Sequence, residues 1–197
     1  MEKLTKRKQQ ALETREKIFH HAINLFANDT YEKITVQDIC NSAGVSVGAF
    51  YHHYSSKADI LDKGYRLFDD MLEKKWADLN ELPPLSAIRE LIIFQIDSLS
   101  NLGIMATLQY FKNQLTNGQR YIINKDRFFY KKMKHCIEQA VNNHTLTGHT
   151  TTITDELLST SRGIIYDWCL HDGSYSLKER TIKITNMILE HYMCHPS

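Results

Sequence analysis

Long hydrophobic runs are missing from the sequence, and proline and glycine are scarce. The most concentrated apolar stretch covers only residues 91–96, whereas a membrane-spanning helix needs about 18 or more apolar residues. The N-terminus has no apolar signal segment, so we expect a cytosolic protein without a membrane partner. With 3 prolines, 8 glycines and 42% hydrophobic residues in 197, the chain is neither collagen-like nor disordered, and it can bury one or two cores.

Cysteine is scarce as well, and the common cofactor motifs are absent. The four cysteines stand far apart without a Cys-x-x-Cys pair, at Cys40, Cys136, Cys169 and Cys194. We expect reduced, mostly buried thiols. No P-loop, dinucleotide fingerprint or His-Glu-x-x-His pattern occurs, and the cluster His191, Cys194 and His195 lacks the paired spacing of a structural zinc site. The sequence therefore predicts no metal site and no cofactor.

Charge of neither sign dominates. The 24 lysines and arginines balance 23 aspartates and glutamates, which gives a net charge of +1. The start of the chain is different, because residues 1–8 hold four bases and one acid. Such a run is typical of a basic arm, and it indicates a nucleic-acid partner.

Apolar residues recur at steps of three and four along almost the whole chain, which is the pattern of amphipathic helices. Residues 150–154 have strand propensity, but they are few and lead into a helical pattern. No run has the composition of a buried parallel strand. We predict an all-α protein with helices at about 9–28, 35–42, 46–53, 56–80, 85–101, 104–115, 121–143, 153–172 and 176–193.

Residues 34–57 carry the most informative pattern. Thr35 and Asp38 form an S/T-x-x-D/E helix start, and Gly44 ends that helix after about two turns. Ser46 is expected to cap a second short helix, on which two aromatic residues four apart share one face. Two short helices joined by a tight glycine turn form a helix-turn-helix.

This segment resembles the TetR/AcrR family of one-component transcriptional regulators. The family pattern reads roughly T-v-x-x-I-A-x-x-A-G-V-S-x-G-x-x-Y-x-H-F-x-x-K-x-x-L, preceded by a helix with R-x-x-I-x-x-A-A-x-x-L-F. The matching residues are Arg15, Ile18, Ala22, Leu25, Phe26, Thr35, Ile39, Ala43, Gly44, Val45, Ser46, Gly48, Tyr51, His53, Lys57 and Ile60-Leu61. The chain departs from the pattern at Cys40, Tyr54 and Val47, and Val47 replaces a common Lys or Arg, which removes a phosphate or base contact.

The resemblance covers about residues 12–62 and implies a fold of about nine helices. It implies a three-helix helix-turn-helix DNA-binding domain with a basic N-terminal arm over residues 1–56. A helical bundle over residues 57–197 would then serve effector binding and dimerisation. Dimerisation also suits DNA geometry, because two copies on a two-fold axis can read a palindromic operator in double-stranded DNA.

The second short helix of such a domain lies in the major groove. Its small or apolar residues Val47, Gly48 and Ala49 predict readout through thymine methyl groups and close backbone approach, with Gln37 as a polar candidate for adenine. Residues suited to phosphate contacts are Thr35, Ser46, Tyr51, His52 and Lys57.

His53 is a further candidate for DNA contact, and Lys3 to Lys8 are expected to reach into the adjacent minor groove. Each assignment has an alternative. Tyr51 and His53 could instead pack inside the three-helix domain, and Gln37 could simply be solvated.

The second part of the chain supplies candidates for two further sites. The resemblance implies an effector pocket for a small apolar or aromatic ligand, and its candidate residues are Phe94, Met105, Tyr110, Phe111, Phe128 and His135. Polar groups such as Gln95 and Gln114 could orient that ligand. A dimer interface on the last two helices is predicted at Ile165, Trp168, Ile184 and Ile188. The alternative is that these apolar residues are plain monomer core.

The predicted function is that of a dimeric repressor that a small ligand releases from its operator. One alternative is an interaction protein that kept the fold and lost DNA binding, which the near-neutral charge and Val47 favour. Another is a serine hydrolase, because Gly44 to Gly48 spell G-x-S-x-G. The capped helix expected before Ser46 argues against the buried strand that a nucleophile elbow requires, so we do not expect an enzyme.

Overall fold

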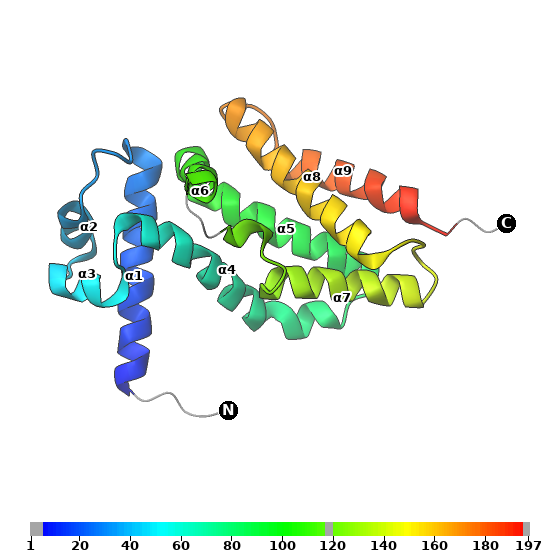
Figure 1. Cartoon of the computed structure of the whole chain (residues 1–197), viewed down its shortest axis with the longest axis horizontal. Coiled ribbons are helices and arrows are strands. Elements are labelled where there is room, and N and C mark those ends of the chain that lie inside the picture. Colours follow the sequence, from blue (N-terminus) through cyan, green and yellow to red (C-terminus); the bar gives the residue numbers. More distant parts are fainter. Residues whose placement is uncertain (1–5, 117–119, 195–197) are drawn as a thin grey trace.

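A computed structural model of the chain describes residues 6–116 and 120–194 (Figure 1). These residues form nine α-helices, one 3-10 helix and no named β-strand, with one isolated bridge between Leu146 and Met193. The predicted all-α fold is confirmed. The elements are α1 (Lys6–Asn28), α2 (Val36–Ala43), α3 (Val47–His53), α4 (Lys57–Asn80), α5 (Pro84–Leu102), α6 (Ile104–Thr116), η1 (Tyr121–Ile123), α7 (Phe128–Asn142), α8 (Thr150–Leu170) and α9 (Leu177–Tyr192).

The helix-turn-helix forms through local capping. The Thr35 hydroxyl accepts the Asp38 N–H, and the Asp38 carboxylate accepts the Thr35 N–H, so α2 starts with a capping box. Gly44 ends α2 with φ 60°, a left-handed conformation that glycine adopts without strain. Ser46 then caps α3 by accepting the Ala49 N–H at 3.1 Å. These caps explain why α2 and α3 lie within one residue of their predicted bounds.

Three predicted helix bounds are wrong. Helix α1 begins at Lys6, so the bases at 6–8 belong to its first turn and not to an extended arm; Lys3 lies outside the described residues. Residues 121–143 do not form one helix, because the Asn124 side chain accepts the Asp126 N–H in a turn between η1 and α7. Helix α8 starts at Thr150, so tertiary packing overrides the strand propensity of its threonines.

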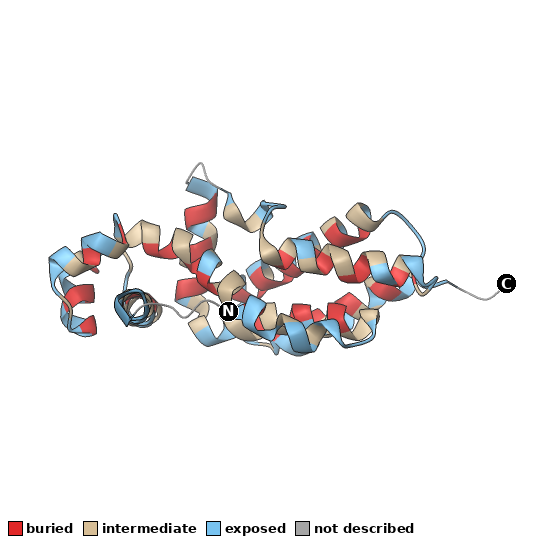
Figure 2. Ribbon diagram, turned by 90° about the horizontal axis from the view of Figure 1, so that it is seen from below, coloured by how far each residue is buried: buried red, intermediate tan, exposed pale blue. Residues whose placement is uncertain are grey.

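Two hydrophobic cores lie side by side along the chain (Figure 1; Figure 2, red). The N-terminal core consists of buried residues from α1 to α3, Ile60, Leu61 and Leu67 of α4, and Ala106 and Tyr110 of α6. The C-terminal core is built from α4, α5, α7, α8 and α9. Helix α4 belongs to both, so it links the helix-turn-helix to the rest of the molecule.

Within the described ranges, no single helix has both the length and the apolarity of a membrane span. Helices α5 and α6 meet that test only as a pair, and they are bent by 109° between Leu102 and Ile104.

Lys57 at the start of α4 holds the loop between α1 and α2. Its ammonium group donates to the backbone carbonyls of Tyr31 at 2.6 Å and Ile34 at 2.8 Å, and it stands 4.3 Å above the centroid of the Tyr31 ring. A single cation thus fixes two residues of the loop relative to α4. The loop in turn sets where α2 begins.

Replacing Lys57 with methionine should lower the free energy of unfolding by about 2 kcal/mol, because the loop carbonyls lose a charged hydrogen-bond donor. Urea denaturation followed by circular dichroism measures the change. Lys33→Met is the matched control, since Lys33 is exposed on the same loop. Equal unfolding midpoints for the two variants would show that the Lys57 contacts do not stabilise the fold.

Helices α4, α1 and α6 meet closely at Gly64. A Cβ atom at this position would lie 1.9 Å from the Tyr110 hydroxyl oxygen and 3.0 Å from the Phe19 ring. Only a glycine therefore allows Tyr110 to reach the backbone of α4. Both Gly64 and Tyr110 are buried in this contact.

Gly64→Ala should destabilise the protein by about 1–3 kcal/mol through overpacking against Tyr110. The double variant Gly64→Ala with Tyr110→Phe should recover part of that loss, because the nearest clashing atom is gone, and thermal unfolding measures both. Gly48→Ala is the control, since its new methyl group meets only the Ser46 side chain at 3.9 Å. A fully additive double variant would contradict the close contact.

Candidate functional site

Helix α3 presents a small, exposed surface at one end of the molecule (Figure 1). Phe50 is fully buried and points into the N-terminal core, whereas Ser46, Gly48 and His52 are exposed on the outer side. Val47 is 37% exposed and Tyr51 is 56% exposed. The Tyr51 ring packs edge-on against the Phe50 ring. Ala49 is half-buried. The structure therefore brings Ser46, Val47, Gly48, Tyr51 and His52 together on one accessible face.

Two of the residues predicted to contact DNA have their polar groups bonded within the protein, and a third is half-buried. The Thr35 hydroxyl donates to Asp38 at 2.6 Å and accepts the Asp38 N–H in return, so it is used by the capping box. Lys57 is held by the loop carbonyls described above. His53 is half-buried, and burial together with the charges of His52, Arg15 and Lys63 lowers its pKa, which keeps the ring neutral at pH 7.

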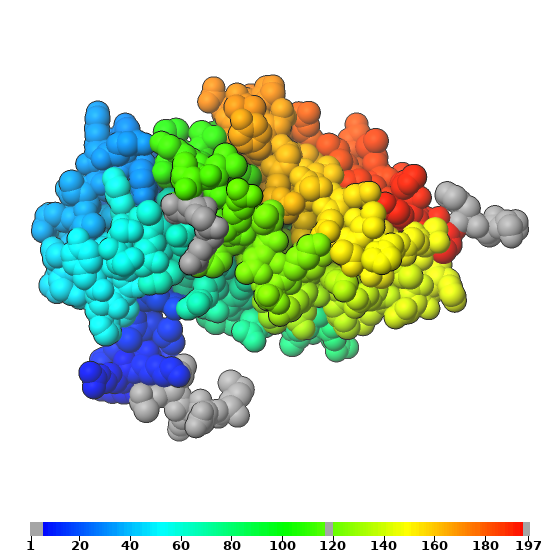
Figure 3. Space-filling model, in the orientation of Figure 1, coloured from blue at the N-terminus to red at the C-terminus, as the bar shows by residue number. Residues whose placement is uncertain are grey.

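Gln37 lies exposed on α2, where its amide group donates to the Asn41 side chain at 2.8 Å. The sequence pattern did not identify one basic residue near the turn, Lys17, as a candidate for DNA contact. The Lys17 ammonium group of α1 stands 3.7 Å from the point where a Gly44 Cβ would lie, and Lys17 is exposed. Only the packing of α1 across the helix-turn-helix brings it there, so no local pattern could reveal it. The first residues of α1 project from the body of the molecule (Figure 3, dark blue).

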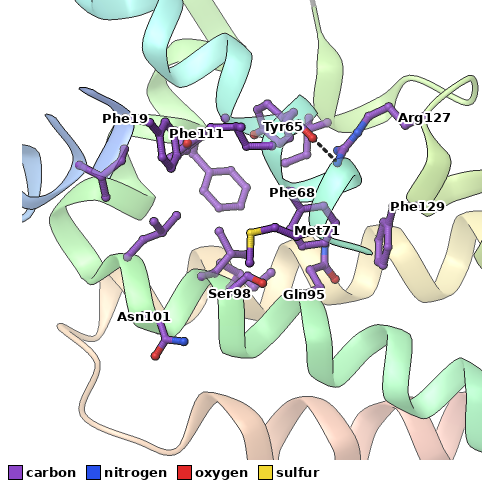
Figure 4. A pocket seen from close by; sticks show the side chains of 18 of the residues that line it. Phe19, Tyr65, Phe68, Met71, Gln95, Ser98, Asn101, Phe111, Arg127 and Phe129 are labelled. Atoms are coloured by element: carbon purple, nitrogen blue, oxygen red, sulfur yellow. Dashed lines mark hydrogen bonds between the residues drawn. The ribbon is translucent and has the colours of Figure 1, made fainter. Parts of the chain in front are cut away.

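A cavity of about 570 Å³ lies where α1, α4, α5, α6, α7 and α8 converge (Figure 4). Its walls are mainly apolar and rich in aromatic rings. The rings and other large apolar side chains that line it are Phe19, Ile23, Tyr65, Leu67, Phe68, Met71, Leu99, Leu102, Tyr110, Phe111, Ile122, Phe129, Tyr130, Leu158 and Ile165. Helix α1 of the helix-turn-helix region is therefore part of the cavity wall.

Several polar side chains also reach this cavity. Arg127 forms two hydrogen bonds with the Asp69 carboxylate, at 3.0 and 2.8 Å, and its guanidinium group lies 4.8 Å from the centroid of the Tyr65 ring. Figure 4 shows its hydrogen bond to the Tyr65 carbonyl. The Gln95 carbonyl oxygen accepts the Ser161 hydroxyl at 2.7 Å. Arg162 of α8 lines the cavity too, and burial lowers the pKa of its guanidinium group.

The structure brings only part of the predicted pocket together. Tyr110, Phe111 and Gln95 line the cavity. Phe94 packs against Phe68 but does not reach the cavity, and Met105 is 52% exposed near the start of α6.

The remaining pocket predictions also lie elsewhere. Phe128 and His135 contact Trp76 between α4 and α7, and the buried Gln114 accepts the Ile122 N–H. None of these three lines the cavity. The wall draws on six helices, so aromatic content along the chain could not separate it from ordinary core.

The predicted dimer residues are largely used inside the protomer. Ile165 is buried and lines the cavity, and Trp168 is buried with its indole N–H donating to the Tyr175 carbonyl at 3.1 Å. Ile184 and Ile188 are half-buried against the C-terminal core. Helical periodicity identified an apolar face but not whether that face pointed inward. The outer face of α8 and α9 instead carries Gly163, Tyr166, Leu170 and Met187.

Ser46 does not sit in a nucleophile elbow. It follows the glycine that ends α2, and its hydroxyl caps α3, whereas an elbow places the serine between a buried strand and a helix. In the part of the chain that the structure describes, no three His, Cys, Asp or Glu side chains come close enough to hold a metal ion. His195 of the C-terminal cluster lies outside the described residues.

Comparison with known proteins accounts for this arrangement. Residues 18–63 match the family described as bacterial regulatory proteins, tetR family. The chain is 26% identical over 213 residues to the HTH-type transcriptional regulator AcrR of Shigella flexneri, which covers 98% of this chain and 95% of AcrR. It is 33% identical over 89 residues to the HTH-type transcriptional repressor KstR2 of Rhodococcus jostii, covering 45% of this chain and 38% of KstR2.

The fold is also that of a solved regulator. FadR of Thermus thermophilus, a TetR family transcriptional repressor crystallised in complex with lauroyl-CoA, matches 93% of this chain and 97% of its own chain, with a TM-score of 0.65 and 19% identity. Regulators of this family are normally not enzymes. The match across the helix-turn-helix and the similarity to AcrR over nearly the full length show that this chain is a TetR-like DNA-binding transcriptional regulator.

Proposed function

We propose that the protein is a dimeric repressor that binds a palindromic operator through α3 and leaves it when a small ligand fills the cavity. The exposed face of α3 is the observation that carries the proposal. Its small residues Val47 and Gly48 would let the helix backbone approach base edges closely, and Val47 suits a thymine methyl group. A repressor of this kind would act on DNA in the cytoplasm.

Phosphate contacts would come from groups that the fold leaves available. The Tyr51 hydroxyl and the exposed Lys17 ammonium group flank the turn and α3. Ser46 can still donate its hydroxyl hydrogen while it caps α3. We assign no phosphate contact to Thr35 or Lys57, because their polar groups are used within the protein.

Genomic DNA fragments retained by the purified protein at two salt concentrations supply the operator for testing this interface. On that operator, Tyr51→Ala should weaken binding about tenfold, an effect of about 1.4 kcal/mol, without changing the melting temperature. Lys17→Gln should reduce the slope of log affinity against log salt by about one. Fluorescence anisotropy measures both, and Lys74→Gln, which removes an exposed lysine on α4, is the control. Retention of no specific fragment would favour an interaction protein that lost DNA binding.

Dimerisation is proposed on the outer face of α8 and α9. Tyr166, Leu170 and Met187 are 48%, 60% and 58% exposed, so both helices present large apolar side chains to solvent, as partner-binding surfaces do. An added Cβ at Gly163 would meet no atom within 4 Å, so a partner helix could approach α8 closely there. Two copies joined here would have to place their α3 helices about 34–36 Å apart to read successive major grooves.

Placing charges on this face should produce a monomer. For Tyr166→Glu combined with Met187→Glu, we expect the mass from light scattering at micromolar concentration to fall to that of one chain. Leu115→Glu, which charges an exposed apolar residue on α6, should leave the dimer intact. A double variant that stays dimeric would place the interface elsewhere.

The cavity offers a direct route from ligand to DNA. Phe19 and Ile23 of α1 and Gly64 of α4 line it together with Tyr110, so a bound molecule would press on helices that carry the N-terminal core. Moving a two-state population from 1:99 to 99:1 needs about 5.5 kcal/mol of differential affinity, so the ligand must contact the two states differently. The FadR structure bound to lauroyl-CoA is consistent with ligand binding on this fold.

A further inference from the structure

We propose that the cavity binds an anionic molecule with an apolar, ring- or chain-like body, and that Arg162 binds its acidic group. This inference rests on the proposed function, because it names the chemical class of the effector. Arg162 of α8 would then determine the selectivity of the cavity for anionic over neutral and cationic ligands.

The apolar part of the ligand follows from the cavity wall. Phe19, Phe68, Phe111 and Phe129 surround a space of about 570 Å³, and Figure 4 shows their side chains around the interior together with Met71. A volume of this size suits a small organic molecule. Such walls favour a ligand with an apolar body, because they offer few hydrogen-bonding partners to a polar one.

The charge of the ligand follows from the ionisable groups of the wall. Among the residues that the structure describes, no aspartate or glutamate lines the cavity, whereas Arg127 and Arg162 both do. The charge of Arg127 is already balanced by its two hydrogen bonds with Asp69. Arg162, by contrast, has no hydrogen bond or ion pair with residues 6–116 or 120–194.

The nearest acid to Arg162 is engaged elsewhere. Asp155 interacts with Arg162 only by long-range electrostatic attraction. Its carboxylate already accepts hydrogen bonds from the Lys125 ammonium group at 2.6 Å and from the Tyr130 hydroxyl at 3.0 Å. Burial lowers the pKa of Arg162, which reflects the cost of removing its charge from water. A ligand anion would offset that cost, a neutral ligand would leave it, and a cation would add repulsion.

The position of Arg162 also orients the ligand. Together with Ile122, Tyr130 and Leu158, it separates the cavity from an outer depression whose charged residues are Lys125, Asp155 and Glu156. Of these, Glu156 accepts the Tyr192 hydroxyl. The acidic group would therefore lie at this boundary, with the apolar body extending toward Phe68 and Phe111. The NH2 group of Gln95, whose carbonyl is held by Ser161, is a second donor in the same wall.

Two fluorescent probes with the same ring system test the inference on the full chain without DNA. One is 8-anilino-1-naphthalenesulfonate, which is anionic, and the other is N-phenyl-1-naphthylamine, which lacks the sulfonate. Arg162→Gln should weaken binding of the sulfonate probe about tenfold, as expected for loss of a charge-assisted contact, and leave the neutral probe unchanged. Arg162→Lys should retain part of the affinity.

The matched control is Arg66→Gln, which removes an exposed arginine on α4 and should change neither probe. Unchanged binding of the neutral probe to Arg162→Gln also shows that the cavity still folds. Equal loss of both probes would mean that Arg162 only supports the structure, and equal retention would mean that it does not bind the anion. Either result overturns the inference.

Competition against the neutral probe tests the order of preference. Decanoate should displace it at lower concentration than decanol, and decyltrimethylammonium should be weakest. A cation that competes best would overturn the inference. The same compounds added to the protein–operator complex separate the two proposals: Arg162-dependent binding without release of DNA would uphold the ligand class and contradict the effector role.

Discussion

The contact of Tyr110 with Gly64 fixes the position of α6 relative to α4, and the arrangement of the N-terminal and C-terminal cores depends on it. Without a side chain at Gly64, the tyrosine hydroxyl reaches the backbone of α4, and the Phe19 ring of α1 packs at the same point. Burial holds the pKa of Tyr110 well above its ordinary value, so its hydroxyl group stays neutral. Any shift of α4 relative to α6 must be accommodated here, between the N-terminal core and the cavity.

Local chemistry made the helix-turn-helix predictable. Thr35 with Asp38, Gly44 and Ser46 act on backbone groups within three residues of themselves, so their pattern in the sequence fixes where α2 and α3 begin and end. Sequence could also separate the buried Phe50 from the exposed residues around it. It could not show that the Lys57 ammonium group turns toward the loop carbonyls of Tyr31 and Ile34, because that contact spans more than twenty residues.

The cavity and the outer face of the last helices were less predictable for a different reason. In helices α5 to α8, periodicity places Ile165 and Phe94 on apolar faces, but it does not show what those faces contact. Arg162 gave no signal either, since one arginine in a mixed helix is ordinary. Its role follows only from its surroundings in the fold: the walls are aromatic, the neighbouring Asp155 already has a partner, and no carboxylate of residues 6–116 or 120–194 lines the cavity.

Helix α1 belongs at once to the cavity wall and to the core beneath α2 and α3, which has a consequence for how the protein would respond in a cell. Binding energies at two linked sites are reciprocal: if a ligand lowers affinity for the operator by some factor, the operator lowers affinity for the ligand by the same factor. Protein on DNA would then respond only at higher ligand concentrations than free protein. The number of operators per dimer, and not the cavity alone, would set the threshold at which transcription begins.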